Sequence, residues 1–242
     1  MTDAAAASGE IRTLLGVWAH PDDEAYLSSG LMAQVRRAGG RVVVVTATRG
    51  EHGTDDPRAW PPERLAQHRE RELRESLDIV GVHEHRWLPY RDGELADVPL
   101  ATGAAALVEV LEEVRPDTIV TFGPEGMTGH DDHRTISGWT TEAWRRTGRR
   151  GRLWYATLTH EFHHAWGPLN HEVGLWFDGS RPPATSRSDL AAHLHLAGRR
   201  LAQKHRALRA HASQTSALED LVGAAVYRRW WAEESFVAGP AE

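Results

Sequence analysis

Hydrophobic residues along the chain follow two different spacings in turn, and this alternation predicts strands separated by helices. Short apolar or β-branched runs predict buried strands at 13–19, 41–47 and 117–122. Apolar residues at helical spacing predict helices over 27–38, 63–80, 104–114 and 131–147. A strand–helix rhythm of this kind favours an α/β fold with a mainly parallel sheet and helices on both faces.

The remaining pattern divides the chain into four parts. Weaker strand candidates lie at 84–88, 153–158 and 173–177, and two closing helices are expected at about 190–211 and 217–234. We expect a flexible N-terminus at 1–12 and one domain at 13–242, with a βα core at 13–177 and C-terminal helices at 189–235 that form a helical cap. The loop-like segment 178–188 is the best boundary between core and cap.

One residue breaks the pattern of the helix at 63–80. Arg69 stands in the apolar stripe that includes Leu65 and Leu73. Arginine is rarely buried unless its charge has a partner. Such a residue either extends to the rim of the core or points into a site, and a nearby cleft favours the site.

Composition and charge exclude several classes of protein. Lys and Arg number 28 against 34 Asp and Glu, a net charge of −6, which argues against binding to nucleic acid or to an anionic membrane. The chain has no cysteine, so disulfides, thiolate metal sites and cysteine nucleophiles are excluded. Neither a membrane-spanning run nor a signal-peptide pattern stands in the sequence, and we expect a cytoplasmic protein.

Acidic residues and histidines follow two of the predicted strands. His20–Glu24 (HPDDE) comes directly after the first strand, and His130–His133 (HDDH) follows the strand at 117–122. Taken singly, each cluster is equally consistent with the acidic first turn of a helix. Because the carboxyl ends of parallel strands meet at the edge where ligands bind, the two clusters together predict a metal site.

The residue types in these clusters suggest how a metal ion would be held. Without cysteine, a catalytic divalent metal needs imidazole and carboxylate ligands. His20, Asp23 and His133 supply two histidines and one aspartate, which leaves a position open for water. Asp22 is then free to act as a base, and His130, one helical turn before His133, is within reach of the same cavity.

With these residues the sequence resembles the LmbE-like, or PIG-L-type, zinc-dependent N-acetylglucosaminyl deacetylases. The specific part of the likeness is HPDDE combined with H-x-D-H. Weaker matches to the family's other motifs stand at Thr48–Gly53 (TRGEHG), Arg69–Leu73 (REREL), Arg91–Gly93 (RDG) and Lys204–Gln214. The likeness extends over about residues 13–214.

The resemblance implies a Rossmann-like fold and a hydrolase that removes an N-acyl group, acetyl above all, from a glucosamine-type sugar by means of a zinc-activated water. The roles that it implies are zinc ligands His20, Asp23 and His133, general base Asp22, carbonyl-polarising His130, sugar-binding Arg69 and Asp92, and Asp132 as the partner that orients a site histidine. Zinc is the expected cofactor, although the same ligands also suit Fe²⁺ or another divalent metal. The expected partner is a small amino-sugar substrate, and assembly into a homo-oligomer stays open.

Three other functions are compatible with parts of the pattern. An enzyme of the same family could cleave a larger thiol-sugar conjugate, of the mycothiol-conjugate type. Two histidines and one carboxylate also form the metal site of non-haem Fe(II) oxygenases, but those enzymes are usually β-barrels, whereas this chain alternates strands and helices. A nucleotide-binding module is the weakest alternative, because His-Pro-Asp-Asp stands where a Gly-rich phosphate loop would follow the first strand.

Further polar residues carry weaker expectations. By the resemblance, His211 and Gln214 line either the cleft or an oligomer contact. The loop at 54–62 is a candidate lid or substrate-selecting rim. His160, His163 and His164 are expected to be a surface feature rather than a second metal site.

Overall fold

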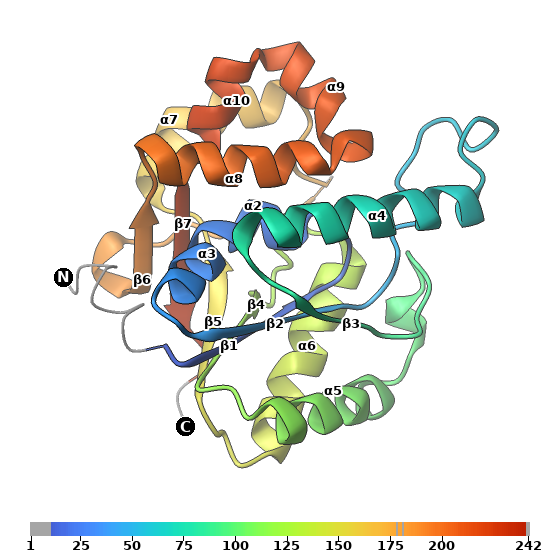
Figure 1. The fold of residues 1–242 in the computed structure, drawn as a ribbon, viewed down its shortest axis with the longest axis vertical. Helices are drawn as coiled ribbons and strands as arrows, with labels where there is room; N and C mark the ends of the chain where they lie inside the picture. Colours follow the sequence, from blue (N-terminus) through green and yellow to red (C-terminus); the bar gives the residue numbers. More distant parts are fainter. Residues whose placement is uncertain (1–10, 178, 181, 241–242) are drawn as a thin grey trace.

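Strands and helices alternate through the first two thirds of the chain, as the hydrophobic pattern predicts (Figure 1). The structure is a computed structural model that describes residues 11–177, 179–180 and 182–240. Its strands are β1 (Thr13–Trp18), β2 (Arg41–Thr46), β3 (Glu84–Trp87), β4 (Thr118–Phe122), β5 (Arg152–Thr157), β6 (Leu190–His195) and β7 (Glu233–Ala238). Its α-helices are α2 (Asp23–Leu27), α3 (Ser29–Arg37), α4 (Pro62–Val80), α5 (Leu100–Val114), α6 (Asp131–Arg146), α7 (His160–Glu172), α8 (Gly198–Ala210), α9 (Ala212–Val222) and α10 (Ala224–Trp230).

The strands form one sheet in the order β3-β2-β1-β4-β5-β7-β6. β1 to β5 are parallel, and β7 runs antiparallel to both of its neighbours, β5 and β6. Helices α5 and α6 cover one face, while α3 and α4 cover the other, with α8 packed outside them (Figure 1). The mainly parallel α/β fold with helices on both faces is therefore confirmed.

The order of the strands determines where the site lies. Chain order runs outward from β1 to β2 and β3 on one side, and from β4 to β5 on the other. Residue Leu15 of β1 accordingly pairs with Val43 of β2 and with Ile119 of β4. In open α/β sheets, the crevice at such a reversal of strand order is the usual binding site. Here it lies between the carboxyl ends of β1 and β4.

The C-terminal part differs from the prediction in its elements. The expected helix over 190–211 begins only at Gly198, because 190–195 is strand β6. Ala192 and Leu194 are buried, a period of two that a run of Leu, Ala and His conceals. The expected helix over 217–234 is broken at Gly223, which has a φ of 83°, and strand β7 begins at Glu233.

The strand expected at 173–177 is also wrong, because helix α7 runs to Glu172 and an irregular segment follows it. The predicted boundary at 178–188 includes residues 178 and 181, which lie outside the described residues. Of the flexible N-terminus expected at 1–12, residues 1–10 also lie outside them, whereas Ile11 is described and buried in the core. Within the described chain, every helix is too short or too polar to cross a lipid bilayer.

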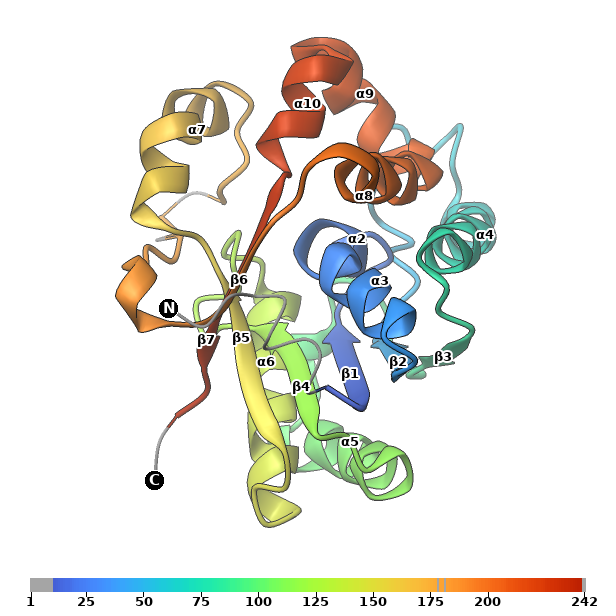
Figure 2. The ribbon, with the colours of Figure 1, turned by 60° about the vertical axis from the view of Figure 1, so that its left-hand side comes forward.

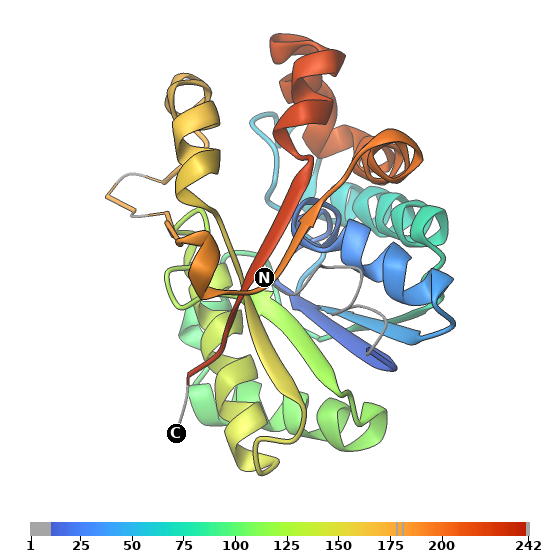
Figure 3. The same ribbon diagram turned by 90° about the vertical axis from the view of Figure 1, so that its left-hand side faces the viewer.

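Helices α8 to α10 nevertheless stand above the carboxyl ends of the central strands, with α7 on the other side (Figures 2 and 3). A buried ion pair connects this cap to the core. Lys204 Nζ of α8 lies 2.7 Å from Glu234 Oε1 and donates to the carbonyl of Tyr26, and both charged side chains are fully buried. The Glu234 carboxylate also accepts from the N–H groups of Gly30 and Leu31 in the first turn of α3. One pair therefore joins α8, β7, α3 and the segment that carries Tyr26.

Removal of the Lys204 charge should destabilise the protein strongly. We expect Lys204→Met to lower the free energy of unfolding by about 3–5 kcal/mol, because it leaves the Glu234 carboxylate buried without its cation. Arg206→Met on the exposed side of the same helix is the matched control and should change it by no more than about 0.5 kcal/mol. Denaturant titration measures both values; equal costs for the two variants would contradict the assignment.

The buried position of His85 on β3 predicts that stability depends on pH. Burial lowers the pKa of His85 to about 4, and its Nε2 lies 3.0 Å from Thr46 Oγ1. In the unfolded chain His85 takes up a proton near pH 6.5. The contribution of the neutral, buried ring to stability is therefore fully present above that pH and is lost as the pH drops from 6.5 towards 4. We expect His85→Gln to remove about 1–3 kcal/mol of this loss. Denaturant titrations at several pH values should show it, and the exposed control His83→Gln should keep the wild-type slope.

Candidate active site

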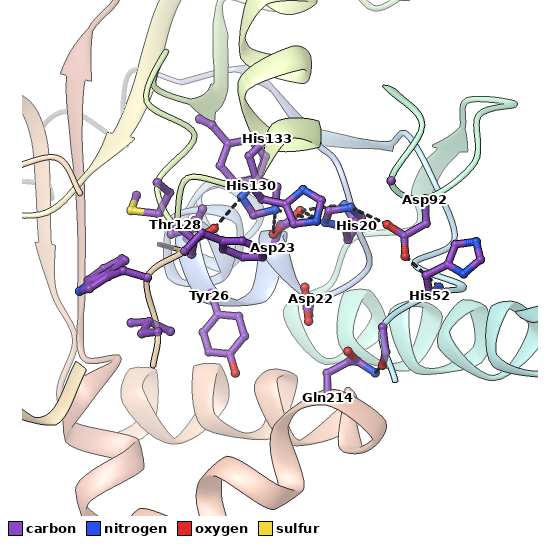
Figure 4. Close-up of a pocket in the computed structure, with 18 of the residues that line it drawn as sticks. His20, Asp22, Asp23, Tyr26, His52, Asp92, Thr128, His130, His133 and Gln214 are labelled. Carbon is purple, nitrogen blue, oxygen red and sulfur yellow. Dashed lines mark hydrogen bonds and ion pairs between the residues drawn. The ribbon is translucent and has the colours of Figure 1, made fainter. Parts of the chain in front are cut away.

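A cavity of about 560 Å³ opens at the carboxyl ends of β1 and β4 (Figure 4). The two sequence clusters meet there, as the predicted topology requires. Of the predicted site residues, the cavity is lined by His20, Asp22, Asp23, Arg69, Asp92, His130 and His133. Asp132 is fully buried behind them.

Short connections from the two strands position these side chains. β1 ends at Trp18, and two residues later His20 lies at the edge of the sheet, while Asp23 begins α2. On the other side, His130 caps the start of α6, and His133 lies in the first turn of that helix. Acidic residues in both first turns suit the positive ends of the helix dipoles, so the helix-start interpretation of the clusters is compatible with a site.

Ligand-type atoms of three residues converge between the two helix starts. His20 Nδ1 lies 3.1 Å from His133 Nε2. Asp23 Oδ1 lies 3.4 Å from His133 Nε2, and Asp23 Oδ2 lies 3.8 Å from His20 Nδ1. Ligands at about 2.0–2.2 Å from a tetrahedral metal ion are about 3.3–3.6 Å apart. The three separations, 3.1, 3.4 and 3.8 Å, lie around this range, so the three side chains are close enough together to hold one ion.

The hydrogen bonds of the two histidines show which ring nitrogens carry hydrogen. His20 Nε2 lies 3.1 Å from both Asp132 Oδ2 and Asp92 Oδ1, so this nitrogen is the donor. His133 Nδ1 lies 3.0 Å from the carbonyl of Gly126, so it donates as well. In neutral rings the lone pairs are then on His20 Nδ1 and His133 Nε2, which face each other. Such an arrangement needs a proton or a metal ion between the two nitrogens, and second partners of this kind are typical of metal-binding histidines.

The surrounding charges favour the same cation. Burial lowers the pKa of His20, but hydrogen bonds to Asp132 and Asp92 and the charge of Asp23 outweigh it and raise this pKa to about 10. Burial also lowers the pKa of His133 well below its usual value. A proton on His20 thus satisfies the carboxylates when no metal ion does. The donor set, two imidazoles and a carboxylate, fits a divalent metal ion.

His130 belongs to two groups of ligand-type atoms that lie within 4.8 Å of one another in the described chain, one with His20 and His133 and one with His20, Asp92 and Asp132. Its hydrogen bonding distinguishes it from a ligand. His130 Nδ1 accepts from the Asp132 backbone N–H at 3.1 Å, and burial lowers the pKa of the ring. The neutral ring therefore carries its hydrogen on Nε2, where it can donate to a bound molecule.

The backbone of Asp22 has an unusual conformation, which hydrogen bonds to buried side chains hold in place. Its φ is 112°, a region that residues with a side chain seldom adopt. Its N–H donates to Glu24 Oε2 at 3.0 Å, and Glu24 Oε1 lies 2.8 Å from Nε2 of the buried His211. Arg69 Nη2 donates to the Pro21 carbonyl and lies 3.3 Å from Asp22 Oδ2. Burial raises the pKa of Asp22, and the charge of Arg69 opposes this effect.

Arg69 and Asp92 both form hydrogen bonds with other groups of the protein. The guanidinium of Arg69 donates to the Gly50 carbonyl at 2.8 Å, and a side chain at either Gly50 or Gly53 would collide with it. This collision explains the glycines of the TRGEHG loop. Asp92 Oδ2 accepts from the His52 N–H at 2.9 Å, while Asp92 Oδ1 binds His20.

The other expectations have mixed outcomes. Gln214 lines the cavity, as one of the two expectations had it. His211 does not line the cavity; it is buried against Glu24, which in turn holds the backbone of Asp22, and the sequence analysis did not predict this position. The loop residues Thr54 and Asp55 reach the rim of the cavity. His160, His163 and His164 lie in α7, and none of them belongs to a metal-type group among the described residues. Apolar residues after position 150 that line the cavity were not anticipated.

The sequence comparison agrees with the geometry. The profile of the family described as "PIG-L: GlcNAc-PI de-N-acetylase" matches residues 15–144, more than half of the chain, and includes both clusters. The chain belongs to this family. A relative in Kineococcus radiotolerans, a 1D-myo-inositol 2-acetamido-2-deoxy-alpha-D-glucopyranoside deacetylase, is 36% identical over 160 residues, which cover 54% of this chain and 44% of the relative.

Solved structures of other proteins share the fold. The N,N'-diacetylchitobiose deacetylase from Pyrococcus horikoshii has a TM-score of 0.66 at 22% identity, with 96% of this chain and 85% of that chain covered. The zinc inhibited form of teicoplanin deacetylase also has a TM-score of 0.66, at 15% identity, with 95% and 100% covered. The first three curated relatives are matched over 44%, 63% and 45% of their length, so this PIG-L family chain spans about half of them.

Metal binding should depend on the residues at the centre of this site. We expect the wild-type chain to retain one divalent ion after dialysis, and His133→Ala to lose it, because that variant lacks one of three ligands. Asp132→Asn changes one of the two carboxylate partners of His20, and that carboxylate also accepts from the N–H groups of Gly93 and Leu95, so this variant should weaken metal affinity about 10–100-fold. His160→Ala is the control and should bind as the wild type does. Metal analysis and competition titration measure these affinities; unchanged affinity in His133→Ala would refute the site.

Proposed function

We propose that the protein is a zinc-dependent hydrolase that removes an N-acyl group from a glucosamine-type sugar. The observation that carries the proposal is the convergence of His20 Nδ1 and His133 Nε2, 3.1 Å apart, beside Asp23, with Asp22 and His130 on the same cavity. This arrangement provides three metal ligands, an open position, a base and a hydrogen-bond donor. Hydrolysis of an amide needs each of these groups.

His20, Asp23 and His133 would hold the zinc ion. When bound there, zinc supplies a water molecule whose pKa is close to ~7 and a Lewis acid for the carbonyl oxygen. Because Asp132 and Asp92 hold the ring of His20, and the Gly126 carbonyl holds that of His133, the ligands are oriented in advance.

Asp22 takes the proton from the water that attacks the acyl carbon. The contact with Arg69 favours the ionised carboxylate that this step needs. The N–H of His130 Nε2 meets the carbonyl oxygen as negative charge develops there. Loss of one such donor typically costs a factor of about 10²–10³ in rate. The leaving amine receives its proton from Asp22 or from His130.

Asp92 and Arg69 would bind hydroxyl groups of the sugar. Both Asp92 oxygens retain a free lone pair beside their protein partners, and Arg69 lies in the lining of the same cavity. The name of the Kineococcus relative, a deacetylase of an inositol glucosaminide, supports a glucosamine-type substrate. The zinc inhibited form of teicoplanin deacetylase supports zinc as a metal that binds this fold. The cytoplasmic location and assembly into a homo-oligomer stay predictions.

The activity is tested by release of primary amine from a panel of N-acetylglucosaminides by the zinc-loaded protein. The panel includes free N-acetylglucosamine, its inositol glycoside and a cysteinyl-glucosaminyl conjugate. Amine from at least one acetylated member supports the proposal. Amine from the conjugate alone would favour the amidase alternative, and silence with one zinc ion bound would contradict both.

The two neighbouring aspartates should separate chemistry from metal binding. We expect Asp22→Asn to lower kcat by about 10²–10⁴ while one zinc ion stays bound, because Asp22 moves a proton and does not bind the metal. Asp23→Asn should lose zinc, and Asp131→Asn, on the exposed side of α6, should behave as the wild type. Steady-state kinetics with metal analysis of the same samples measures this; loss of zinc from Asp22→Asn would overturn the assignment.

A further inference from the structure

An apolar wall extends the cavity on one side of the candidate metal site. It consists of the cavity-lining side chains of Tyr26, Leu158, Leu175, Trp176, Phe177 and Trp231. Five of the six lie after residue 144, beyond the segment that the family profile matches. We call these six residues the apolar wall. The family profile therefore does not account for five of its six side chains.

The wall is built into the structure. The ring centroids of Tyr26 and Trp231 are 4.6 Å apart, and the Tyr26 hydroxyl lies 2.7 Å from that of Tyr227. The ring of Phe177 approaches that of His130 at 5.2 Å, and its backbone N–H donates to the Thr128 carbonyl at 3.0 Å. The wall therefore begins directly beside the proposed carbonyl-binding group.

The described residues leave part of this wall uncovered. Phe177 is 54% exposed, one of few large apolar side chains in the described chain that are more than half exposed. Exposed apolar surface that continues into a cavity is typical of ligand-binding sites. Because Phe177 lies beside His130, a molecule that covered this ring would also reach the proposed reacting centre.

The opposite side of the cavity is polar. Asp92 accepts from the His52 N–H, and Gln214 Nε2 donates to the Gly53 carbonyl. In Figure 4, Asp92 and His52 lie on one side of the His20, Asp23 and His133 cluster, whereas Tyr26 and Thr128 lie on the other. Sugar hydroxyls need hydrogen-bonding partners when they leave water, so the sugar belongs on the Asp92 side.

The geometry of an amide then indicates which part of the substrate lies against the apolar wall. A trans amide directs its two substituents away from each other. If the carbonyl group lies at the cluster and the sugar extends towards Asp92, the acyl group extends towards Phe177 and Trp231. We propose that the apolar wall binds the acyl group of the substrate, and that this group is an apolar chain longer than acetyl. This inference rests on the proposed function.

The size of the effect follows from the burial of methylene groups. An acetyl methyl can cover only a small part of six large side chains. Each further methylene buried against them should raise kcat/KM about fourfold, until the chain extends beyond the wall. A specificity for acetyl would instead need a small closed pocket, in which one extra methylene is rejected about 10–200-fold.

The test is a series of methyl glucosaminides that carry N-acetyl, N-butanoyl or N-hexanoyl groups, assayed with the zinc-loaded protein by release of methyl glucosaminide. We expect kcat/KM to be at least tenfold higher for the N-hexanoyl compound than for the N-acetyl compound. A hexyl glycoside of N-acetylglucosamine, compared with its methyl glycoside, controls for the other end of the substrate and should show no such preference.

Two variants connect the preference to the wall. Phe177→Ala and Leu175→Asn should reduce the hexanoyl-to-acetyl ratio several-fold while activity on the N-acetyl compound persists. Leu100→Ala removes an equally exposed leucine on the remote helix α5 and should leave the ratio unchanged. The ratio of two substrates in one variant is insensitive to partial loss of folded protein.

Each contrary result has a distinct meaning. Highest activity on the N-acetyl compound, with a steep fall for longer chains, overturns the inference but leaves the deacylase function intact. A preference for the hexyl glycoside would assign the wall to the group attached to the sugar and would also overturn it. No product from any compound, with zinc bound, would contradict the proposed function itself.

Discussion

Two imidazole nitrogens, His20 Nδ1 and His133 Nε2, face each other at 3.1 Å, while the other nitrogen of each ring is committed as a donor. A buried arrangement of this kind is stable only with positive charge at its centre, whether a proton or a metal ion. The parallel pairing of β1 with β4 brings the two residues together. Asp132 and Asp92 both accept from the ring of His20, and acidic residues begin the helix that carries His133.

A second layer of buried polar contacts supports this centre from the C-terminal cap. His211 and Glu24 hold the backbone of Asp22 in its strained conformation, and Lys204 with Glu234 fastens α8 to the start of α3. The cap therefore does more than cover the sheet. It fixes the residue proposed as the base, and with Trp231 it contributes part of the apolar wall.

Sequence alone predicted the βα core because its strands are buried on both faces and appear as continuous apolar runs. It predicted the meeting of His20 with His133 because both follow strands that end at one edge. It missed β6, whose alternation is short and rich in His and Ala, and it could not pair Glu24 with His211, which is 187 residues away. The apolar wall was missed for a related reason. Trp176 and Phe177 were assigned to a strand, and only the path of the chain after α7 brings them to the cavity.

The most direct measurement is a crystal structure of the zinc-loaded protein, with anomalous diffraction recorded on either side of the zinc absorption edge. We expect one strong peak, about 2.0–2.2 Å from His20 Nδ1, from a carboxylate oxygen of Asp23 and from His133 Nε2, with His130 and Asp22 unbound beside it. A peak bound instead by His130, Asp92 or Asp132, or no peak in this cavity at full zinc loading, would contradict the proposed metal site.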